Sequence, residues 1–321
     1  MPELPEVETI RRGLQTQIVG KTISKIIIKK PNLVKQSRQS FRKELINIKI
    51  TKIDRIGKLL IFSLHKTQSY LLIHLKMTGQ LVYCDDKSFV AGGHANSKKE
   101  EEQFLSAQGG PASSWKLCQP GKYTHIIFEL KEGRGKTSTF SSLFFNDLRQ
   151  FGMLKVVNGE ELRDIKSKYG IEPGRPNFTL RNFRQVFKNR KTNIKALLLN
   201  QRVISGLGNI YVDEALFASK IHPQRPANSL ITNEQKRLFN AIGRIIKLAI
   251  KNNGTTFSDF IDSKGRKGNF KQMLKVYGRQ NKKCLRCQRK VEARPLPLGV
   301  VKIKKIKVAG RGTHFCPRCQ K

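Results

Sequence analysis

The chain has 321 residues, of which 63 are lysine or arginine and 23 are aspartate or glutamate, so its formal net charge is +40. This charge favours a polyanionic partner, nucleic acid first. An anionic membrane surface is the weaker alternative, because the sequence has no apolar run of about eighteen residues and no dominant lysine-rich amphipathic helix. With 38% hydrophobic residues the chain is more than a basic tail, and its length predicts two domains.

The chain begins MPELPEVE, which places a proline at position 2 beside three carboxylates. Removal of the initiator methionine, which a small second residue permits, would expose the secondary amine of Pro2. An α-amino group titrates near pKa ~8 and a lysine side chain near ~10.4, so this terminus would be a ready nucleophile at neutral pH. Attack on a sugar or carbonyl carbon would give an iminium, with Glu3 or Glu6 as acid, base or electrostatic partner.

The same residues have a structural interpretation of equal weight. The prolines would block helix until Val7, and the glutamates favour the N-terminus of a helix over residues 6–14. No signal peptide is expected, because residues 1–20 contain acids where a basic and then an apolar segment would be needed. We therefore expect the protein to remain in the cytosol.

Residues 22–157 contain short apolar or alternating runs between Gly, Asn, Asp and Lys clusters, which predicts an antiparallel β sandwich or barrel. The runs are 23–28, 45–53, 59–64, 70–75, 81–83, 125–130 and 140–145. The segment 85–121 is polar and Gly-rich and carries the charged patch KKEEE. It predicts a disordered or mobile insertion.

After a Pro- and Gly-rich segment at 170–176 the pattern becomes helical, and it predicts helices at 180–188, 193–199, 210–219 and 233–252. The turn before the third helix reads SGLGNIY, and its Asn209 stands where a helix N-terminus would offer backbone N–H groups to a phosphate. The turn fits a non-specific clamp on a phosphate backbone. Simple turn chemistry is the alternative.

Two CxxC pairs lie near the end of the chain. Their members are Cys284, Cys287, Cys316 and Cys319. Two such pairs can present four thiolates to one tetrahedral ion, which is typical of a structural zinc site, whereas chance pairs or a redox CxxC are the alternative. The spacer 288–315 exceeds the usual ~15–20 residues, but residues 298–308 alternate enough to form a β hairpin that lets the pairs meet. Cys84 and Cys118 lack partners at ligand spacing and are expected to be plain thiols.

Six motifs are specific when taken together: PELPEVE at the start, HLKMTG at 74–79, DLRQFG at 147–152, GLGNIY at 206–211, VYGR at 276–279 and RGTHFCPRC at 311–319. With them the chain resembles bacterial formamidopyrimidine-DNA glycosylase over nearly its whole length. The resemblance implies an α+β fold: an N-terminal β sandwich with a catalytic N-terminal helix, a helical helix-two-turn-helix domain and a C-terminal zinc-finger β hairpin, with DNA in the cleft. The expected boundaries are 1–157, a linker at 158–178, 179–279 and 280–321.

The activity that the resemblance implies is that of a bifunctional DNA glycosylase and AP lyase of base excision repair. Such an enzyme removes 8-oxoguanine and formamidopyrimidines from damaged double-stranded DNA through a Schiff base on Pro2, followed by β- and δ-elimination. Glu3 would donate the proton for base loss, and Glu6 would be a supporting carboxylate. Lys58 matches a lysine that assists β-elimination, and Arg311 matches a zinc-finger arginine linked with δ-elimination and phosphate binding. The resemblance further implies one structural zinc ion per chain, a monomer, and a place in the bacterial cytoplasm on nucleoid DNA.

An enzyme that acts on C1′ of a stacked nucleotide must extrude that nucleotide, and side chains then replace the missing stacking. By resemblance Met77, Arg149 and Phe151 fill this gap, although ordinary core packing would explain Met77 or Phe151 taken singly. Residues 262–270 match a loop that covers the flipped base. The matched phosphate-contacting positions are Lys191, Lys195, Asn209 and Tyr277.

Three departures and two alternatives accompany the resemblance. Tyr123 stands where the family usually has a DNA-contacting histidine, which aromatic stacking or a hydroxyl contact could replace. The insertion and the long finger spacer are unusual for the family. An endonuclease VIII-like glycosylase for oxidised pyrimidines would use the same Pro2 and Glu3, but Leu4 and the RQF wedge favour oxidised purines. A catalytically silent zinc-containing DNA-binding protein is the other alternative, and the intact catalytic residues argue against it.

Overall fold

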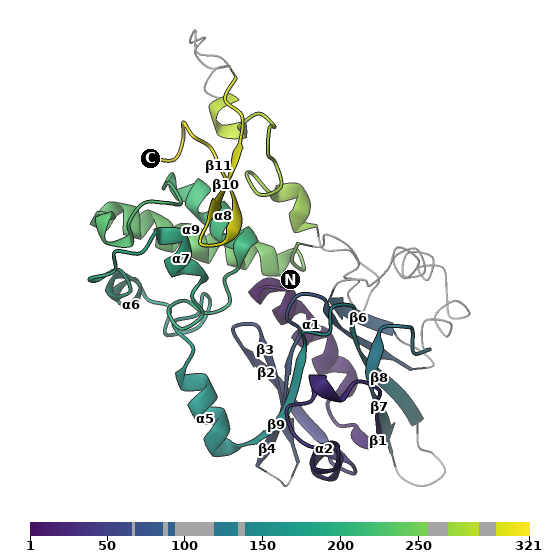
Figure 1. Cartoon of the computed structure of the whole chain (residues 1–321). Helices are drawn as coiled ribbons and strands as arrows, with labels where there is room; N and C mark the ends of the chain where they lie inside the picture. The colour runs from purple at the N-terminus through teal and green to yellow at the C-terminus, as the bar shows by residue number, and fades with distance from the viewer. Residues whose placement is uncertain (66–67, 86–88, 94–118, 134–138, 256–268, 289–299) are drawn as a thin grey trace. The chain divides into compact units, whose positions relative to one another are not determined.

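The computed structural model describes residues 1–65, 68–85, 89–93, 119–133, 139–255, 269–288 and 300–321. The chain forms two compact units. The first comprises Met1–Ser167 and Asn252–Lys271, and the second comprises Lys168–Lys251 and Gln272–Lys321. The chain therefore leaves the first unit after Ser167 and returns to it for the short segment that begins at Asn252 (Figure 1).

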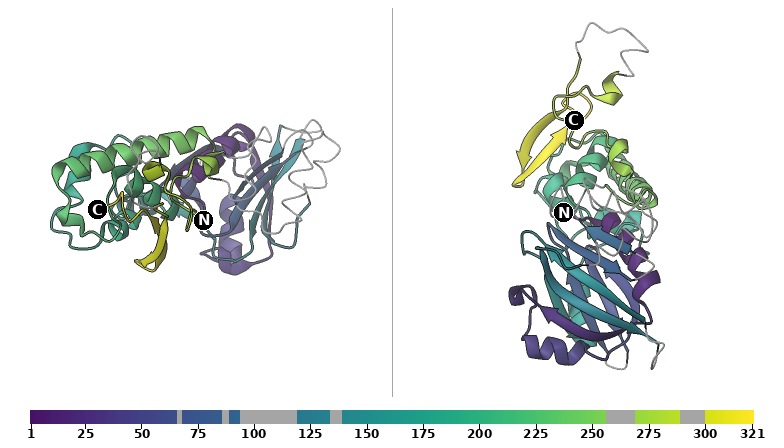
Figure 2. Two further views of the ribbon diagram at one scale, coloured as in Figure 1. Left: turned by 90° about the horizontal axis from the view of Figure 1, so that it is seen from above. Right: turned by 90° about the vertical axis from the view of Figure 1, so that its right-hand side faces the viewer.

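The first unit is built on two antiparallel sheets, as the alternating runs predict (Figures 1 and 2). One sheet has the strand order β1-β7-β8-β5-β6 and the other β2-β3-β4-β9. The strands are β1 (Thr22–Ile28), β2 (Ile50–Ile56), β3 (Leu59–Leu64), β4 (Ser69–His74), β5 (Gly79–Cys84), β6 (Phe89–Gly93), β7 (Thr124–Glu132), β8 (Thr139–Asp147) and β9 (Met153–Asn158).

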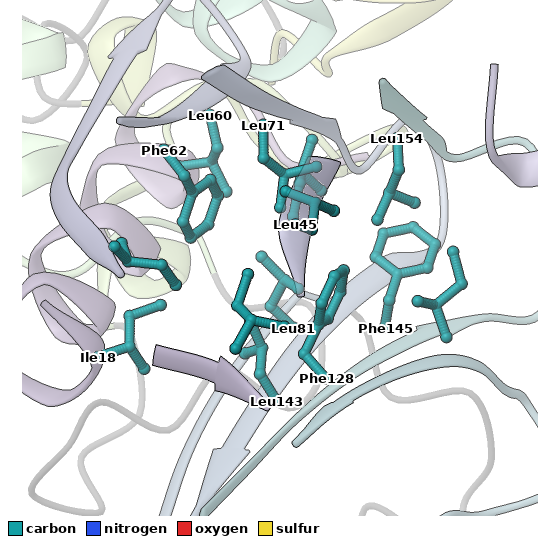
Figure 3. Packing of buried hydrophobic residues seen from close by; sticks show 14 of the residues in the cluster. Ile18, Leu45, Leu60, Phe62, Leu71, Leu81, Phe128, Leu143, Phe145 and Leu154 are labelled. Carbon is teal, nitrogen blue, oxygen red and sulfur yellow. The ribbon is translucent and has the colours of Figure 1, made fainter. Parts of the chain in front are cut away.

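The hydrophobic core of this unit lies between the two sheets (Figure 3). Inward-facing side chains of both sheets belong to one buried cluster, because the period of two along a strand sends alternate residues to one face. Members from the four-stranded sheet include Leu60, Phe62, Leu71 and Leu154. Members from the five-stranded sheet include Leu81, Phe128, Leu143 and Phe145.

Helix α1 (Leu4–Ile18) packs against strands of both sheets and buries the stripe Leu4, Val7, Ile10, Leu14 and Ile18. It is longer than the expected 6–14, because prolines are compatible with the first helical turn. A capping box also satisfies the first backbone donors of the helix, with the Glu3 side chain and the Glu6 side chain as its two acceptors.

One expected strand of the first unit is wrong. Residues 45–53 are not one strand, because helix α2 (Arg38–Leu45) occupies the start of the range and β2 begins only at Ile50. The Ser37 hydroxyl caps α2, and Phe41 and Leu45 bury one face of it. The expected insertion, 85–121, includes the strand β6, which pairs with β5. Residues 94–118 of that insertion, with Cys118, lie outside the described residues, whereas Cys84 is buried on β5.

The second unit contains four helices close to the predicted ranges and a C-terminal β hairpin. The helices are α6 (Leu180–Gln185), α7 (Ile194–Leu199), α8 (Asn209–Ser219) and α9 (Thr232–Lys251), preceded in the chain by α5 (Gly159–Ser167) of the first unit. The hairpin pairs β10 (Lys304–Val308) with β11 (Arg311–Phe315), so it lies further along the chain than the expected 298–308. Ala309 and Gly310 make its turn, both at positive φ, as a tight hairpin requires. No helix in the described part of the chain is long and apolar enough to cross a membrane.

Candidate active site and DNA-binding residues

The carboxylate of Glu6 ties the start of the chain to the segment that returns to the first unit. One oxygen accepts a hydrogen bond from the backbone N–H of Glu3 at 2.9 Å. The other accepts from the backbone N–H and the hydroxyl of Thr255, at 2.7 and 2.9 Å. Gly254 has φ +82°, and a Cβ there would lie 2.6 Å from the Glu6 carboxylate, so this approach needs glycine. Residues far apart in sequence thus fix the position of the N-terminal turn.

The terminal amine lies in a buried, charged environment. Burial lowers the pKa of the Met1 amine below its usual value, Glu3 and Glu6 raise that pKa, and Lys58 lowers it. Pro2 and the side chain of Glu3 are buried beside this terminus. The structure therefore brings four of the expected catalytic residues, Pro2, Glu3, Glu6 and Lys58, to one end of α1.

Lys58 is held in the tight turn between β2 and β3, where Gly57 has φ 54°. Cross-strand pairing places His74 of β4 opposite Leu59, the residue after Lys58. Burial, followed by the charges of Lys76 and Lys58, lowers the pKa of His74 to about 3, so the imidazole is neutral near pH 7. Its Nδ1 accepts a hydrogen bond from the backbone N–H of Lys76 at 2.9 Å, which leaves Nε2 as a donor. We did not single out His74 from the sequence, although it opens the HLKMTG motif.

The side chains expected to fill the gap in DNA lie on two loops of the first unit. Phe151 is 54% exposed, so ordinary core packing does not explain it. The Arg149 guanidinium is also exposed and lies 4.8 Å from the centroid of the Phe151 ring, within cation–π range. Met77 is half-buried in the loop between β4 and β5. The structure thus presents an aromatic ring and a cation together at the β8–β9 loop.

Tyr123, the departure from the expected histidine, is half-buried immediately before β7. The ammonium of Lys122 lies 5.8 Å from the centroid of its ring. Its carbonyl accepts a hydrogen bond from the backbone N–H of Asp147 at 3.0 Å. The backbone of Tyr123 is therefore anchored to the end of β8, close in sequence to Arg149.

Three of the expected phosphate-contacting positions lie on the surface or at the edge of the second unit. Lys191 and Arg311 are exposed, the latter at the start of β11. Asn209 is the first residue of α8, and its side-chain N–H donates to the carbonyl of Gly312 at 2.9 Å. The helix N-terminus of the GLGNIY turn and the finger hairpin are thus in direct contact.

Tyr277 is positioned by a buried carboxylate of α8. The Glu214 side chain accepts hydrogen bonds from the backbone N–H groups of residues 275–277, at 2.8 to 3.0 Å. Burial raises the pKa of Glu214, while these three donors lower it. The Tyr277 ring lies edge-on to His314, with centroids 5.0 Å apart. The loop that carries Tyr277 is therefore attached to both α8 and the finger.

Lys195 does not fit the expected direct contact with a phosphate. Its side chain is completely buried, and its ammonium lies 2.6 Å from the carboxylate of Asp213, which is also buried. The second oxygen of Asp213 accepts from the backbone N–H of His314 at 2.8 Å. An ammonium that is enclosed and paired in this way cannot reach a DNA backbone without breaking the pair. Lys195 instead joins α7 to α8 and, through Asp213, to the finger.

The four cysteines gather at one point, with their sulfur atoms within 4.8 Å of one another. Three of the Sγ–Sγ distances are 3.2, 3.8 and 3.8 Å, close to the ~3.8 Å expected for sulfurs placed about 2.3 Å from a central zinc ion. A hydrogen bond from Cys316 lowers the pKa of Cys284 to about 5, and burial raises the pKa of Cys287 to about 12. Thiols packed this closely cannot all ionise unless a cation neutralises them, so the cluster fits zinc.

The loop expected to cover a flipped base lies mostly outside the described residues, which resume at Asn269. Phe270 begins a 3-10 helix, Phe270–Met273, and is buried. An isolated bridge between Thr255 and Asn269 closes the two described ends of this segment. Those ends are thus fixed beside Glu6.

Comparisons with known proteins agree with this fold. Three family models match: the formamidopyrimidine-DNA glycosylase N-terminal domain over residues 1–154, the H2TH domain of the same enzymes over 169–261, and the zinc finger found in FPG and IleRS over 301–321. The formamidopyrimidine-DNA glycosylase of Pelotomaculum thermopropionicum is 36% identical, covering 100% of this chain and 99% of its own. The chain belongs to the formamidopyrimidine-DNA glycosylase family.

Solved structures in the same family are full-length matches. One is the Lactococcus lactis Fpg variant G226P in complex with DNA that contains Fapy-dG. It matches this chain with a TM-score of 0.78 and 32% sequence identity, and the match covers 100% of each chain. Wild-type Lactococcus lactis Fpg, in complex with DNA that contains an oxidised pyrimidine, has a TM-score of 0.77 at the same identity and coverage.

Proposed function

We propose that this protein is a bifunctional DNA glycosylase and AP lyase of base excision repair that removes 8-oxoguanine and formamidopyrimidines from double-stranded DNA. The observation that carries the proposal is the cluster of Pro2, Glu3, Glu6 and Lys58 at one end of α1. An amine, two carboxyl groups and a second cation are the groups that Schiff-base chemistry at a sugar carbon requires.

In the proposed reaction, the lone pair of the Pro2 nitrogen forms a bond to C1′ while the C1′–N9 bond breaks and its electron pair leaves with the base. Glu3 supplies the proton that accompanies base loss. The Pro2 nitrogen then loses its proton, the C1′–O4′ bond breaks as the C1′=N iminium forms, and O4′ takes up a proton as the sugar ring opens. Loss of the C2′ proton breaks the C3′–O bond, a further elimination breaks the C5′–O bond, and water releases the enzyme from the sugar fragment.

We assign supporting roles to residues around this centre. Glu6 fixes the position of the N-terminal turn through Glu3 and Thr255. Lys58, whose charge acts on the pKa of the neighbouring Met1 amine, assists β-elimination. Arg311 on the finger contacts a phosphate and assists δ-elimination. Zinc, held by the four cysteines, supplies folding free energy to the finger rather than a chemical step.

DNA recognition is divided between base contacts and backbone contacts. We propose that Met77, Arg149 and Phe151 fill the gap left by the extruded nucleotide, because the ring of Phe151 is exposed and Arg149 can hydrogen-bond a base edge. Tyr123 is a further proposed DNA contact, and its backbone is hydrogen-bonded to Asp147, two residues before Arg149. The proposed phosphate contacts are Lys191, Asn209, Tyr277 and Arg311. The protein would act as a monomer on nucleoid DNA in the bacterial cytoplasm.

A second lesion class has specific support. The Lactococcus lactis Fpg has been crystallised with DNA that contains an oxidised pyrimidine, and this chain matches that structure over its full length. Oxidised pyrimidines are therefore the second candidate substrates, handled by the same Pro2 and Glu3.

Strand cutting on matched duplexes tests the lesion class. Duplexes that carry 8-oxoguanine, formamidopyrimidine-guanine, thymine glycol or no lesion are incubated with the protein at one salt concentration. We expect faster cutting of the two purine lesions than of thymine glycol, and no cutting of the intact duplex. Preferential cutting of thymine glycol would assign the protein to oxidised pyrimidines, and binding without cutting would indicate a silent DNA-binding protein.

A further inference from the structure

A single buried carboxylate joins the loops that carry the proposed DNA-gap residues. Asp147, the last residue of β8, is completely buried. Its Oδ1 accepts hydrogen bonds from the hydroxyl of Thr78 and from the backbone N–H of Arg149, the latter at 3.2 Å. Its Oδ2 accepts from the backbone N–H of Gly152 at 2.7 Å. Asp147 thus holds both ends of the loop that presents Arg149 and Phe151.

The hydroxyl of Thr78 extends this connection to the other loop. Thr78 directly follows Met77, and its Oγ1 accepts from the backbone N–H of Arg149 at 3.0 Å while it donates to Asp147. One hydroxyl therefore uses its donor and an acceptor lone pair to bridge the β4–β5 loop and the β8–β9 loop. Movement of Met77 and movement of Arg149 are linked through this group.

The backbone of Asp147 adds a third segment. Its N–H donates to the carbonyl of Tyr123 at 3.0 Å, and its carbonyl lies 2.8 Å from the Nε2 of the buried His125. Four proposed DNA-contacting side chains of the first unit, those of Met77, Tyr123, Arg149 and Phe151, therefore have their backbones arranged around one residue that itself lies out of reach of DNA.

The loop after Asp147 is tightly enclosed on its inner side. At Gly152 a Cβ would lie 2.4 Å from the Phe145 ring and 3.0 Å from the Asp147 carboxylate, so the chain passes where only glycine fits. Gln150 has φ 55°, a left-handed conformation that is unfavourable for a residue other than glycine. These constraints fix the backbone, while Arg149 and Phe151 remain exposed.

We propose that Asp147 and Thr78 are positioning residues that set the geometry of Arg149 against the base opposite the lesion, and so determine opposite-base specificity. The proposal rests on the proposed function and on the role of Arg149 in it. Thr78 and Asp147 do not contact the DNA bases; they act by joining the two loops. Loss of the hydrogen bonds between the two loops should therefore change the preference between duplexes that differ in the base opposite the lesion.

The test compares Thr78→Val, which has nearly the same shape but no hydroxyl, with Thr78→Ser, which keeps the hydroxyl. The measured quantity is the ratio of single-turnover cutting rates for 8-oxoguanine opposite cytosine and opposite adenine. One hydrogen bond contributes about 0.5–1.5 kcal/mol, so we expect Thr78→Val to lower the ratio by roughly 2- to 12-fold. Thr78→Ser should restore most of it. Thr124→Val is the matched control. The buried hydroxyl of Thr124, on β7, donates to the side chain of Asn146, the residue before Asp147 on β8.

A double-mutant cycle with Arg149→Ala identifies the route of the effect. If Thr78 acts through Arg149, the double variant should have the same ratio as Arg149→Ala alone. A ratio unchanged in Thr78→Val, an equal fall in Thr124→Val, or additive effects in the cycle would overturn the inference. If the unaltered protein cuts neither duplex, it is the proposed function that fails. If Thr78→Val does not fold, the cytosine-to-adenine ratio of cutting rates is measured in Asp147→Asn instead. Folding of that variant is checked by thermal unfolding.

Discussion

At the scale of single residues, the geometry gives neighbouring carboxyl groups different tasks. Glu6 is engaged by three donors and serves to hold the N-terminal turn. Glu3 is buried at the start of α1, beside the terminal amine. Glu8, two residues after Glu6, is instead paired with Arg12 and Arg55. The sequence alone shows three similar acids, and only the fold distinguishes them.

Glu3→Gln should separate the two activities of the enzyme. The proton that leaves with the base is not needed for elimination at a preformed abasic site. We expect base excision from an 8-oxoguanine duplex to fall by about 10²- to 10⁴-fold, the usual range for loss of general acid catalysis, while much of the strand cutting at abasic sites remains. Equal losses in the two assays would show that Glu3 serves folding or binding instead.

For single residues, the sequence predicts a role well where a local motif defines that role. It fails where the role depends on a contact with a residue far away in the sequence. The start of the chain and the four cysteines were found by residue type and spacing, and the structure gathers each group. Lys195 was assigned to a phosphate by its position, but its ammonium is buried against Asp213. No local pattern indicates that ion pair, because it joins residues of two different helices, α7 and α8. His74 was overlooked because one histidine in an apolar strand end carries little signal.

At the scale of elements, α1 is fixed to the sheet by a buried ion pair. Glu8 accepts from Arg55 of β2 at 2.8 Å, and from Arg11 and Arg12 of its own helix at 3.0 and 2.7 Å. Burial alone would raise the pKa of Glu8, but the hydrogen bonds and charges of these arginines outweigh it and lower the pKa to about 2. The ion pair therefore holds the catalytic helix only while Glu8 is ionised.

This linkage predicts an acid-dependent loss of stability. The folded pKa of Glu8 lies below the unfolded value of about 4.5, so its contribution is complete above that pH and is lost as pH falls towards 2. The contribution is therefore fully present at neutral pH and lost under strongly acidic conditions. Urea unfolding at pH 7 and at pH 3 should show a smaller loss of stability for Glu8→Gln than for the unaltered protein. The same loss in both proteins would contradict the linkage.

The finger hairpin should depend on zinc. We expect elemental analysis to find about one zinc per chain and a Cys284→Ser, Cys316→Ser double variant to lose it, because four thiolates are needed to close a structural site. Cys84→Ser is the matched control, since Cys84 is buried in the other unit. Unchanged zinc in the double variant would refute this ligand set.

Elements whose apolar residues follow a clear period were predicted closely, and others were not. Strand β3 and helices α7 to α9 match their expected ranges within a few residues. Helix α9 buries one apolar stripe, whereas β3 and α8 are runs of residues buried on nearly all sides. Helix α2 was missed because its sequence RQSFRKEL is mostly polar and only Phe41 and Leu45 are buried. The hairpin is expected too early because residues 298–308 contain only its first strand. The turn at Ala309 and Gly310 then leads into the second strand, which sets the register.

For the whole molecule, the charge of +40 determines how tightly DNA of any sequence is held. About 5 to 8 phosphate contacts would give a slope of log K against log salt of roughly −4 to −7. Lys191→Ala should make this slope shallower and weaken damaged and undamaged duplexes alike, because a phosphate contact carries no base information. Binding titrations from about 50 to 300 mM salt measure the slope. A selective loss of binding to damaged DNA would show that Lys191 recognises the lesion.

The central claim is that the amine of Pro2, freed by loss of Met1, forms the covalent bond to the sugar. Borohydride reduction during turnover of an 8-oxoguanine duplex, followed by proteolysis and mass spectrometry, tests it most directly. We expect the chain to lack Met1 and the sugar fragment to be attached to the N-terminal peptide at Pro2. A full yield of adduct in a Pro2→Gly variant, or attachment to a lysine such as Lys58, would contradict the claim.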